Sequence, residues 1–228
     1  MSKTIEDLFY YIATYIPLLP SLVFLVFAIQ FEKYRKNWVL KTVASYALLE
    51  FLTNFSTQFV TIQVTILFYA LFTLLEYLLF ARSFFLIIKS QVAKKGIVFL
   101  SLGFTVFWIL YQIYGPKNVL DSVPIGVASI LILIYAFYFF YEEMENVSQG
   151  PIYTRFTFWI TAGIMVYLAG NFFLYVFSNQ VDARTRHIFW MFGNLCAILK
   201  NIFFVISILA FWKKKSSKMP VNPRFSLL

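Results

Sequence analysis

The sequence has few of the residues on which most catalytic and metal sites depend. Its 228 residues include one cysteine, one histidine and ten acidic residues. The single cysteine, Cys196, rules out an intrachain disulfide and is expected to be a small buried residue. The single histidine, His187, cannot supply the three protein ligands that a catalytic zinc site needs. No Ser–His or Cys–His pair is apparent in the apolar segments, and no glycine-rich phosphate loop is present. The sequence therefore does not predict an enzyme.

Hydrophobic residues, in contrast, make up 61% of the chain. Soluble domains are nearer 45–50% apolar, so this composition indicates an integral membrane protein. A membrane-spanning helix needs about 20 apolar residues. Seven such segments fill nearly the whole chain, at about 8–30, 38–58, 63–88, 97–114, 123–141, 156–177 and 188–212.

This pattern predicts an all-α fold, a polytopic membrane protein with a bundle of seven transmembrane helices. Residues 1–212 form one transmembrane domain, and residues 213–228 form a basic tail. Pro17 and Pro20 predict a kink in the first segment, because proline removes a backbone donor from a helix.

The distribution of positive charge sets the expected orientation. The net charge is +9, and fourteen of the 19 Lys and Arg residues fall on the side that holds the tail. Cytoplasmic loops collect Lys and Arg, which predicts the N-terminus outside and the C-terminus inside. We expect the inner (cytoplasmic) membrane of a bacterium, with the tail lying on anionic membrane lipid. Because the cations sit in loops on one side of the membrane, a nucleic-acid partner is not predicted.

One loop departs from this charge pattern, because it is acidic. Glu142, Glu143 and Glu145 follow the fifth apolar segment. Acidic residues contribute little to membrane orientation, so the predicted topology stands. These carboxylates are expected to form a solvated loop face.

Three ionisable residues lie inside predicted membrane segments: Glu50, Glu76 and Lys200. Each is about 18–21 Å from the start of its helix at 1.5 Å per residue, so all three are near mid-membrane. A charge at that depth is costly and needs a partner. We expect one carboxylate to pair with Lys200 and the other to be protonated. The pair can lock helices together, or it can form a ligand, proton or ion site.

Small and polar residues surround Lys200 at helical spacing. They predict close packing of the sixth and seventh segments, with amide hydrogen bonds across the interface. Asn54, toward the outer end of the second segment, is expected to border a polar pocket. The candidate ligand or ion-pair site therefore comprises Glu50, Glu76, Lys200, Asn54, Asn171, Asn194, Asn201 and Tyr167, with no catalytic or metal-ligating residue.

The last third of the chain resembles a known family. Its sixth segment carries Phe158, Trp159, Gly163, Tyr167, Gly170, Asn171, Phe172 and Phe173, and its seventh carries Asn194, Lys200 and Asn201. This pattern resembles the uncharacterised seven-helix inner-membrane proteins of Bacteroidota that are often encoded beside sensor histidine kinases. The resemblance implies an inner-membrane location and a signalling partner such as a histidine kinase or another membrane protein.

A retinal-binding rhodopsin is an alternative. A lysine in the seventh helix and a carboxylate in the third would suit a Schiff base, Lys200, with a counter-ion, Glu76. The sequence departs from the microbial rhodopsin pattern, because Cys196 stands where an aspartate is expected and the sixth segment lacks a proline. No other cofactor is expected.

Two hypotheses for function follow from the membrane charges. The first is a sensory or signal-coupling, receptor-like module with a polar intramembrane site. The second is a transporter of a small solute, an ion or protons that uses Glu50, Glu76 and Lys200. The chain shows no internal repeat of the kind on which many transporters are built, which weighs against the second hypothesis.

Overall fold

The computed structural model describes residues 3–115, 122–145, 151–177 and 183–216. These residues form helices and no strand, which confirms the all-α prediction. The elements are α1 (Lys3–Tyr15), α2 (Leu18–Gln30), α3 (Glu32–Arg35), α4 (Trp38–Ser56), α5 (Ile62–Ile87), α6 (Gln91–Tyr114), α7 (Ser122–Glu145), the short 3-10 helix η2 (Ile152–Thr154), α8 (Phe156–Phe177) and α9 (Ala183–Ser216).

The long helices have the make-up of a multi-pass membrane protein. Five stretches are long and apolar enough to cross a membrane, and a shorter apolar helix covers Phe156–Phe172. The five are Leu8–Gln30, Ile62–Ile87, Gln91–Tyr114, Val123–Glu145 and Trp190–Trp212. α9 runs on to Ser216, into the predicted basic tail, and residues 217–228 of that tail lie outside the described residues.

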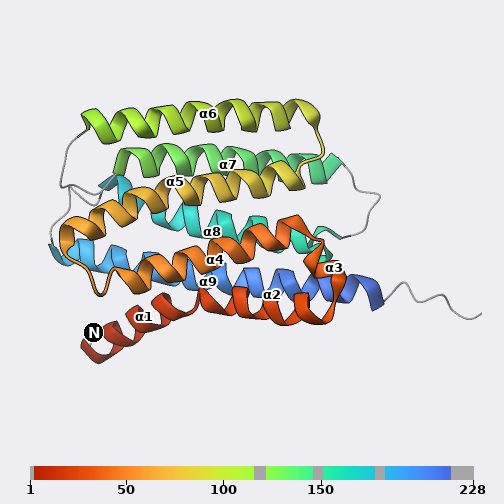
Figure 1. The fold of residues 1–228 in the computed structure, drawn as a ribbon, viewed down its shortest axis with the longest axis horizontal. Coiled ribbons are helices and arrows are strands. Elements are labelled where there is room, and N and C mark those ends of the chain that lie inside the picture. The colour runs from red at the N-terminus through yellow and green to blue at the C-terminus, as the bar shows by residue number, and fades with distance from the viewer. Residues whose placement is uncertain (1–2, 116–121, 146–150, 178–182, 217–228) are drawn as a thin grey trace, which may run out of the picture.

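The first apolar segment is broken, as its prolines predicted. α1 ends at Tyr15 and α2 begins at Leu18, with Pro17 between them. Pro17 has no N–H to donate, so the ladder of helical hydrogen bonds is interrupted there. α1 and α2 therefore lie at an angle to each other (Figure 1).

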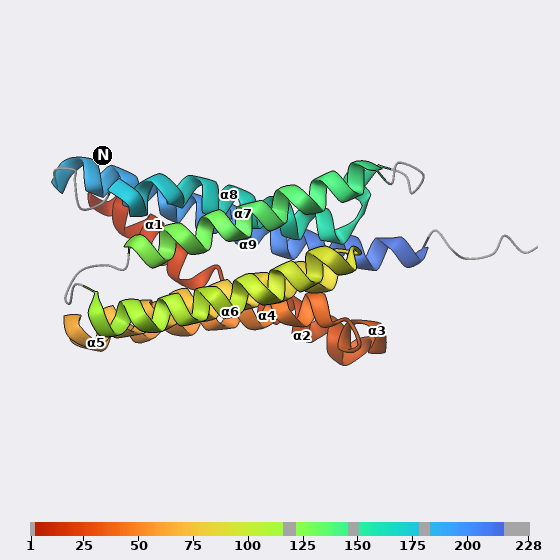
Figure 2. The same cartoon turned by 90° about the horizontal axis from the view of Figure 1, so that it is seen from above.

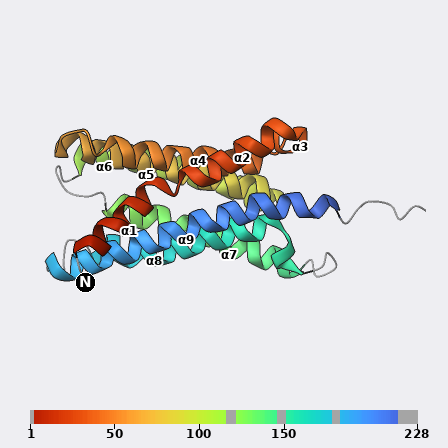
Figure 3. The ribbon, with the colours of Figure 1, turned by 90° about the horizontal axis from the view of Figure 1, so that it is seen from below.

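The helices form two layers. Figures 2 and 3 show α2, α4, α5 and α6 on one side and α7, α8 and α9 on the other. α1 leaves the first layer and packs against α9 in the second. α5 meets α7, and α2 meets α9, where the layers join.

Small residues bring α8 and α9 together, in the most extensive helix contact of the described chain. A Cβ on Gly163 would lie 3.0 Å from Phe203 Cβ and 3.3 Å from the Lys200 carbonyl oxygen. A Cβ on Gly170 would overlap Cys196 Sγ. The predicted packing of these two helices is therefore confirmed, and it fixes the position of Lys200 against α8.

α3 is fixed to the end of α9 by a buried tyrosine. Tyr34 is 0% exposed, and its hydroxyl donates to the Ile208 carbonyl at 3.0 Å. Burial raises the pKa of Tyr34 to about 12, so the hydroxyl stays protonated and able to donate near neutral pH. The contact holds the first layer against the second at this end of the bundle.

The acidic residues after the fifth apolar segment are not a solvated loop face, and that prediction is wrong for two of them. α7 continues to Glu145, so all three carboxylates are helical. Glu142 and Glu143 are each only 8% exposed. The Glu142 carboxylate accepts hydrogen bonds from the backbone N–H groups of Lys89 and Ser90, both at 2.8 Å.

These contacts explain why α6 begins at Gln91, six residues before the predicted segment. N–H groups at a helix start have no partner within the helix, and a carboxylate there also compensates the helix dipole. Glu143 pairs with Lys89 at 3.1 Å and also with Arg155. We call Glu142, Glu143, Lys89, Ser90 and Arg155 the end clamp; it ties α7 to the start of α6 and to the segment before α8.

Replacing Gly163 by leucine is expected to destabilise the protein. The added side chain would meet Phe203 and the backbone of α9, and overpacking of this kind costs about 1–3 kcal/mol. The melting temperature in detergent should fall. Gly103→Leu is the matched control, because nothing lies within 4 Å of a Cβ at Gly103. Equal melting temperatures for the two variants would contradict the α8–α9 contact.

Replacing Glu142 by alanine should loosen the start of α6. Each buried N–H left without a partner costs about 1–3 kcal/mol. Amide hydrogen exchange at Lys89 and Ser90 should accelerate. Glu145→Ala is the control, since that exposed carboxylate accepts a hydrogen bond from Tyr141 of its own helix, at 2.6 Å, and among the described contacts none joins it to α6. Unchanged exchange in Glu142→Ala would show that the end clamp does not hold α6.

Candidate functional site

The site begins with two residues on one face of α4. Tyr46 and Glu50 are four residues apart, so their side chains lie one above the other on the helix. The start of α4 is fixed by Asn37, whose side chain accepts from the Leu40 N–H at 3.1 Å. Both side chains are buried, with Tyr46 at 1% and Glu50 at 4% exposure. α4 therefore presents one hydroxyl and one carboxylate to the interior.

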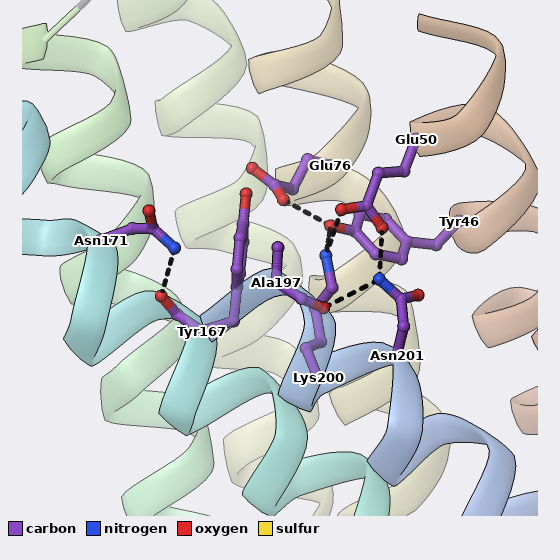
Figure 4. Close-up of polar contacts among 8 residues, drawn as sticks. All are labelled: Tyr46, Glu50, Glu76, Tyr167, Asn171, Ala197, Lys200 and Asn201. Carbon is purple, nitrogen blue, oxygen red and sulfur yellow. Dashed lines mark hydrogen bonds and ion pairs between the residues drawn. The ribbon is translucent and has the colours of Figure 1, made fainter. Parts of the chain in front are cut away.

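Lys200 of α9 reaches these groups from the other layer. It is fully buried, at 0% exposure. Its Nζ donates to Glu50 Oε1 at 2.7 Å and to the Tyr46 hydroxyl at 2.6 Å (Figure 4). The Tyr167 ring of α8 lies against the ammonium, with its centroid 3.9 Å from Nζ. The structure thus brings Lys200 to Glu50, and two aromatic rings add cation–π contact to the ion pair.

Asn201 supports the ion pair from the next position on α9. Its Nδ2 donates to Glu50 Oε2 at 3.3 Å and to the Ala197 carbonyl at 2.9 Å. Both carboxylate oxygens of Glu50 therefore have a donor. The Oδ1 of Asn201 is buried and has no hydrogen-bond partner in the part of the chain that the structure describes.

Tyr46 carries the network onward to Glu76 of α5. Its hydroxyl, which accepts from Lys200, donates to Glu76 Oε1 at 2.8 Å. Glu50, Lys200, Tyr46 and Glu76 therefore form a continuous chain of polar contacts, which we call the charge network. Tyr46 was not among the predicted residues. The signal that would have found it is its four-residue spacing from Glu50 on a helix with a buried carboxylate.

A small cavity lies beside Glu76, between α5, α7 and α8. Its volume is about 10 Å³, which is about the space of one water molecule. The Tyr167 hydroxyl points toward the Glu76 carboxylate (Figure 4). The polar residues on the cavity wall are Thr73, Glu76, Tyr77, Ser129, Tyr167 and Asn171. Sites for organic ligands are usually 300–1,000 Å³, so this cavity matches a much smaller occupant.

The predicted amides divide into two groups. Asn171 lines the cavity and donates to the Tyr167 carbonyl at 2.9 Å, and Asn201 belongs to the charge network. Asn54 is one turn beyond Glu50 on α4, and Asn194 is six residues before Lys200 on α9; both are half-buried. Among the described contacts, none joins the side chain of Asn54 or Asn194 to the charge network.

No protein-family model, curated protein or solved structure matches the chain. The resemblance to the Bacteroidota proteins therefore stays a prediction. The chemistry of the site must be argued from its own groups. Two carboxylates and one ammonium share a buried space at the meeting of α4, α5, α8 and α9.

A pair of substitutions tests whether Lys200 and Glu50 are coupled. Removing one member of a buried ion pair costs about 3–5 kcal/mol, because the other charge stays buried without compensation. Lys200→Met and Glu50→Gln are each expected to lower the melting temperature strongly. The double variant should recover much of the loss, since replacing both members is often close to neutral.

The control uses an exposed pair with the same chemistry. Lys36 and Glu32 are 2.8 Å apart, with side chains 75% and 62% exposed. Such surface pairs contribute about 0–1 kcal/mol, so Lys36→Met should change little. If Lys200→Met and Glu50→Gln were simply additive, the ion pair would not exist in the folded protein.

Proposed function

We propose that this protein is a seven-span inner-membrane protein that couples a signal across the bundle. The two layers of helices would move relative to each other at the charge network. The count of seven takes α1 and α2 as one broken span and adds α4 and α8 to the other long helices. The alternating direction of these helices gathers the basic loops at the end where α9 finishes (Figure 1). The positive-inside rule supports placing that end, with the C-terminus, in the cytoplasm and the N-terminus outside.

The single observation that carries this proposal is the position of the ion pair. Glu50 belongs to the first layer and Lys200 to the second. The backbones of α4 and α9 approach each other at few points. Their connection therefore depends mainly on the contact between the Lys200 ammonium, the Glu50 carboxylate and the Tyr46 hydroxyl.

The same geometry provides a route for the signal. Neutralising one member of the pair removes one charged contact between the layers, whereas the end clamp and the packing of α5 on α7 and of α2 on α9 still tie them. The two layers would then shift relative to each other, with the largest change expected at the end away from the end clamp. A switch requires an element with two arrangements whose populations a local change in charge can shift, and the two layers would be that element.

α9 is the element that would carry the movement to a partner. Its 34 residues span about 50 Å at 1.5 Å per residue, against about 30 Å of hydrocarbon. One end of the helix therefore extends beyond the membrane core. We propose that the basic end of α9, lying on anionic membrane lipid, contacts a cytoplasmic partner such as a sensor histidine kinase.

A transporter remains the second candidate, on one specific observation. The charge network and the cavity beside Glu76 form a continuous polar path of ionisable groups between three helices. Intramembrane chains of this kind serve as proton relays in pumps and transporters. Proton or solute flux into liposomes that is lost in Glu76→Gln would favour this candidate over signal coupling.

Retinal on Lys200 stays a prediction. A Schiff base would require Nζ to leave both Glu50 and Tyr46, its present hydrogen-bond partners. A visible absorption band that appears with retinal and is absent from Lys200→Ala would establish it.

The layer movement can be measured with two spin labels. Ile62 of α5 and Ile188 of α9 are 73% and 58% exposed, in different layers and at the end away from the end clamp. With Cys196→Ala as background, Ile62→Cys and Ile188→Cys report the distance between the layers. Lys200→Met is expected to shift or broaden this distance distribution. Lys36→Met should leave it unchanged.

The outcome shows whether the charge network controls the distance between the layers or only stabilises the fold. If Lys200→Met gives the same distribution as the wild-type pair in lipid nanodiscs, the charge network does not control the layers and the proposal fails. A signalling role further requires that a kinase crosslinks to the α9 end in native membranes. No kinase crosslink would overturn the proposed partner, and proton flux would then decide for the transporter.

A further inference from the structure

The charge network carries more negative than positive charge. Two carboxylates, Glu50 and Glu76, share one ammonium, Lys200. Glu50 contacts the ammonium directly, whereas the polar groups that meet the Glu76 carboxylate among the described residues are the neutral hydroxyls of Tyr46 and Tyr167. An uncompensated charge in a membrane interior is costly. Glu76 therefore needs one additional positive charge, which either a proton or a metal cation can supply.

The groups around Glu76 are suited to a small monovalent cation. Glu76 lines a cavity that has the space of about one water molecule. Thr73 and Ser129 line the same cavity, and the hydroxyl of each donates its proton to a backbone carbonyl of its own helix, at 3.0 Å and 2.8 Å. Their oxygens can therefore act as acceptors.

Asn171 supplies a further oxygen. Its Nδ2 donates to the Tyr167 carbonyl at 2.9 Å, and the Oδ1 of the same amide, which can only accept, belongs to a side chain that lines the cavity. One carboxylate, two hydroxyls and one amide oxygen are hard oxygen ligands of the kind that alkali and alkaline-earth cations prefer. Because the site has one carboxylate that lacks one positive charge, it suits a monovalent cation rather than a divalent one.

We propose that Glu76, Thr73, Ser129 and Asn171 bind one sodium ion. The ion would sit where α5 of the first layer meets α7 and α8 of the second, so occupancy would add a second contact between the layers. The inference concerns the same charge network as the proposed function, but it does not require that the layers move. Sodium binding and layer separation are measured by different experiments.

A proton is the competing occupant, and the neighbouring ionisable groups decide how pH acts. Those groups are Tyr46 and Glu50 of α4, Tyr77 of α5, Tyr135 of α7 through its 3.1 Å bond to Tyr77, Tyr167 of α8 and Lys200 of α9. Sodium and protons would compete for the same carboxylate, so sodium binding should weaken as pH falls.

Chemical modification of Glu76 is the direct test. A hydrophobic carbodiimide reacts with carboxyl groups in membrane interiors, and mass spectrometry of the full-length protein in nanodiscs reads the modified residue. NaCl should slow modification of Glu76 relative to N-methylglucamine chloride at the same ionic strength and pH. At about ten times the half-protecting concentration the rate should fall about tenfold, because only the sodium-free fraction reacts.

Two comparisons make the result decisive. Ser129→Ala should raise the half-protecting sodium concentration and keep Glu76 reactive, whereas Ser101→Ala, a hydroxyl on α6 that bonds Tyr77 at 3.3 Å, should not. Protection by raised pH alone, with no effect of sodium, would overturn the proposal in favour of a proton site. Sodium protection with unchanged spin-label distances would keep the sodium site and contradict only the signal-coupling proposal.

Discussion

The buried ammonium of Lys200 is the constraint on which the arrangement of the bundle depends. A fully buried cation must be compensated by groups that the fold brings to it. Glu50 and Tyr46 of α4 and the ring of Tyr167 on α8 meet it from three directions. α8 can come this close because Gly163 leaves room for the backbone of α9. The small residues therefore allow the close approach of α8 and α9 that places Tyr167 against the Lys200 ammonium.

Polar contacts join the layers alongside the apolar packing, and the charge network and the end clamp are the two that contain ion pairs among the described residues. The charge network lies within the bundle, and the end clamp lies at the start of α6. A contact between layers that consists of a few charged groups weakens when one of those charges is removed. Close-packed helices such as α8 and α9, in contrast, move as one body. This difference is the physical basis for proposing a switch at the charge network.

The sequence predicted the all-α fold and the main contact of the site. Apolar length predicted the long helices, the prolines predicted the break at Pro17, and the cost of a buried charge predicted that Lys200 meets a carboxylate. The short helix α3 and the continuation of α7 to Glu145 were not predicted. Tyr46 was missed, because its only signal in the sequence is the four-residue spacing from Glu50, and many tyrosines of this chain stand in apolar helices. The burial of Glu142 was also missed, since its partners are backbone groups 53 and 52 residues away. Such long-range contacts leave no local pattern.

The most direct test of the central claim is the distance between the Lys200 ammonium and the Glu50 carboxylate in a lipid bilayer. Solid-state NMR on protein with ¹⁵Nζ-lysine and ¹³Cδ-glutamate measures it, with Lys200→Arg identifying the Lys200 signal. We expect strong dipolar dephasing of that signal, in keeping with the 2.7 Å contact between Nζ and Oε1, and its loss in Glu50→Gln. A Lys200 signal that is not dephased by Glu50 would contradict the account.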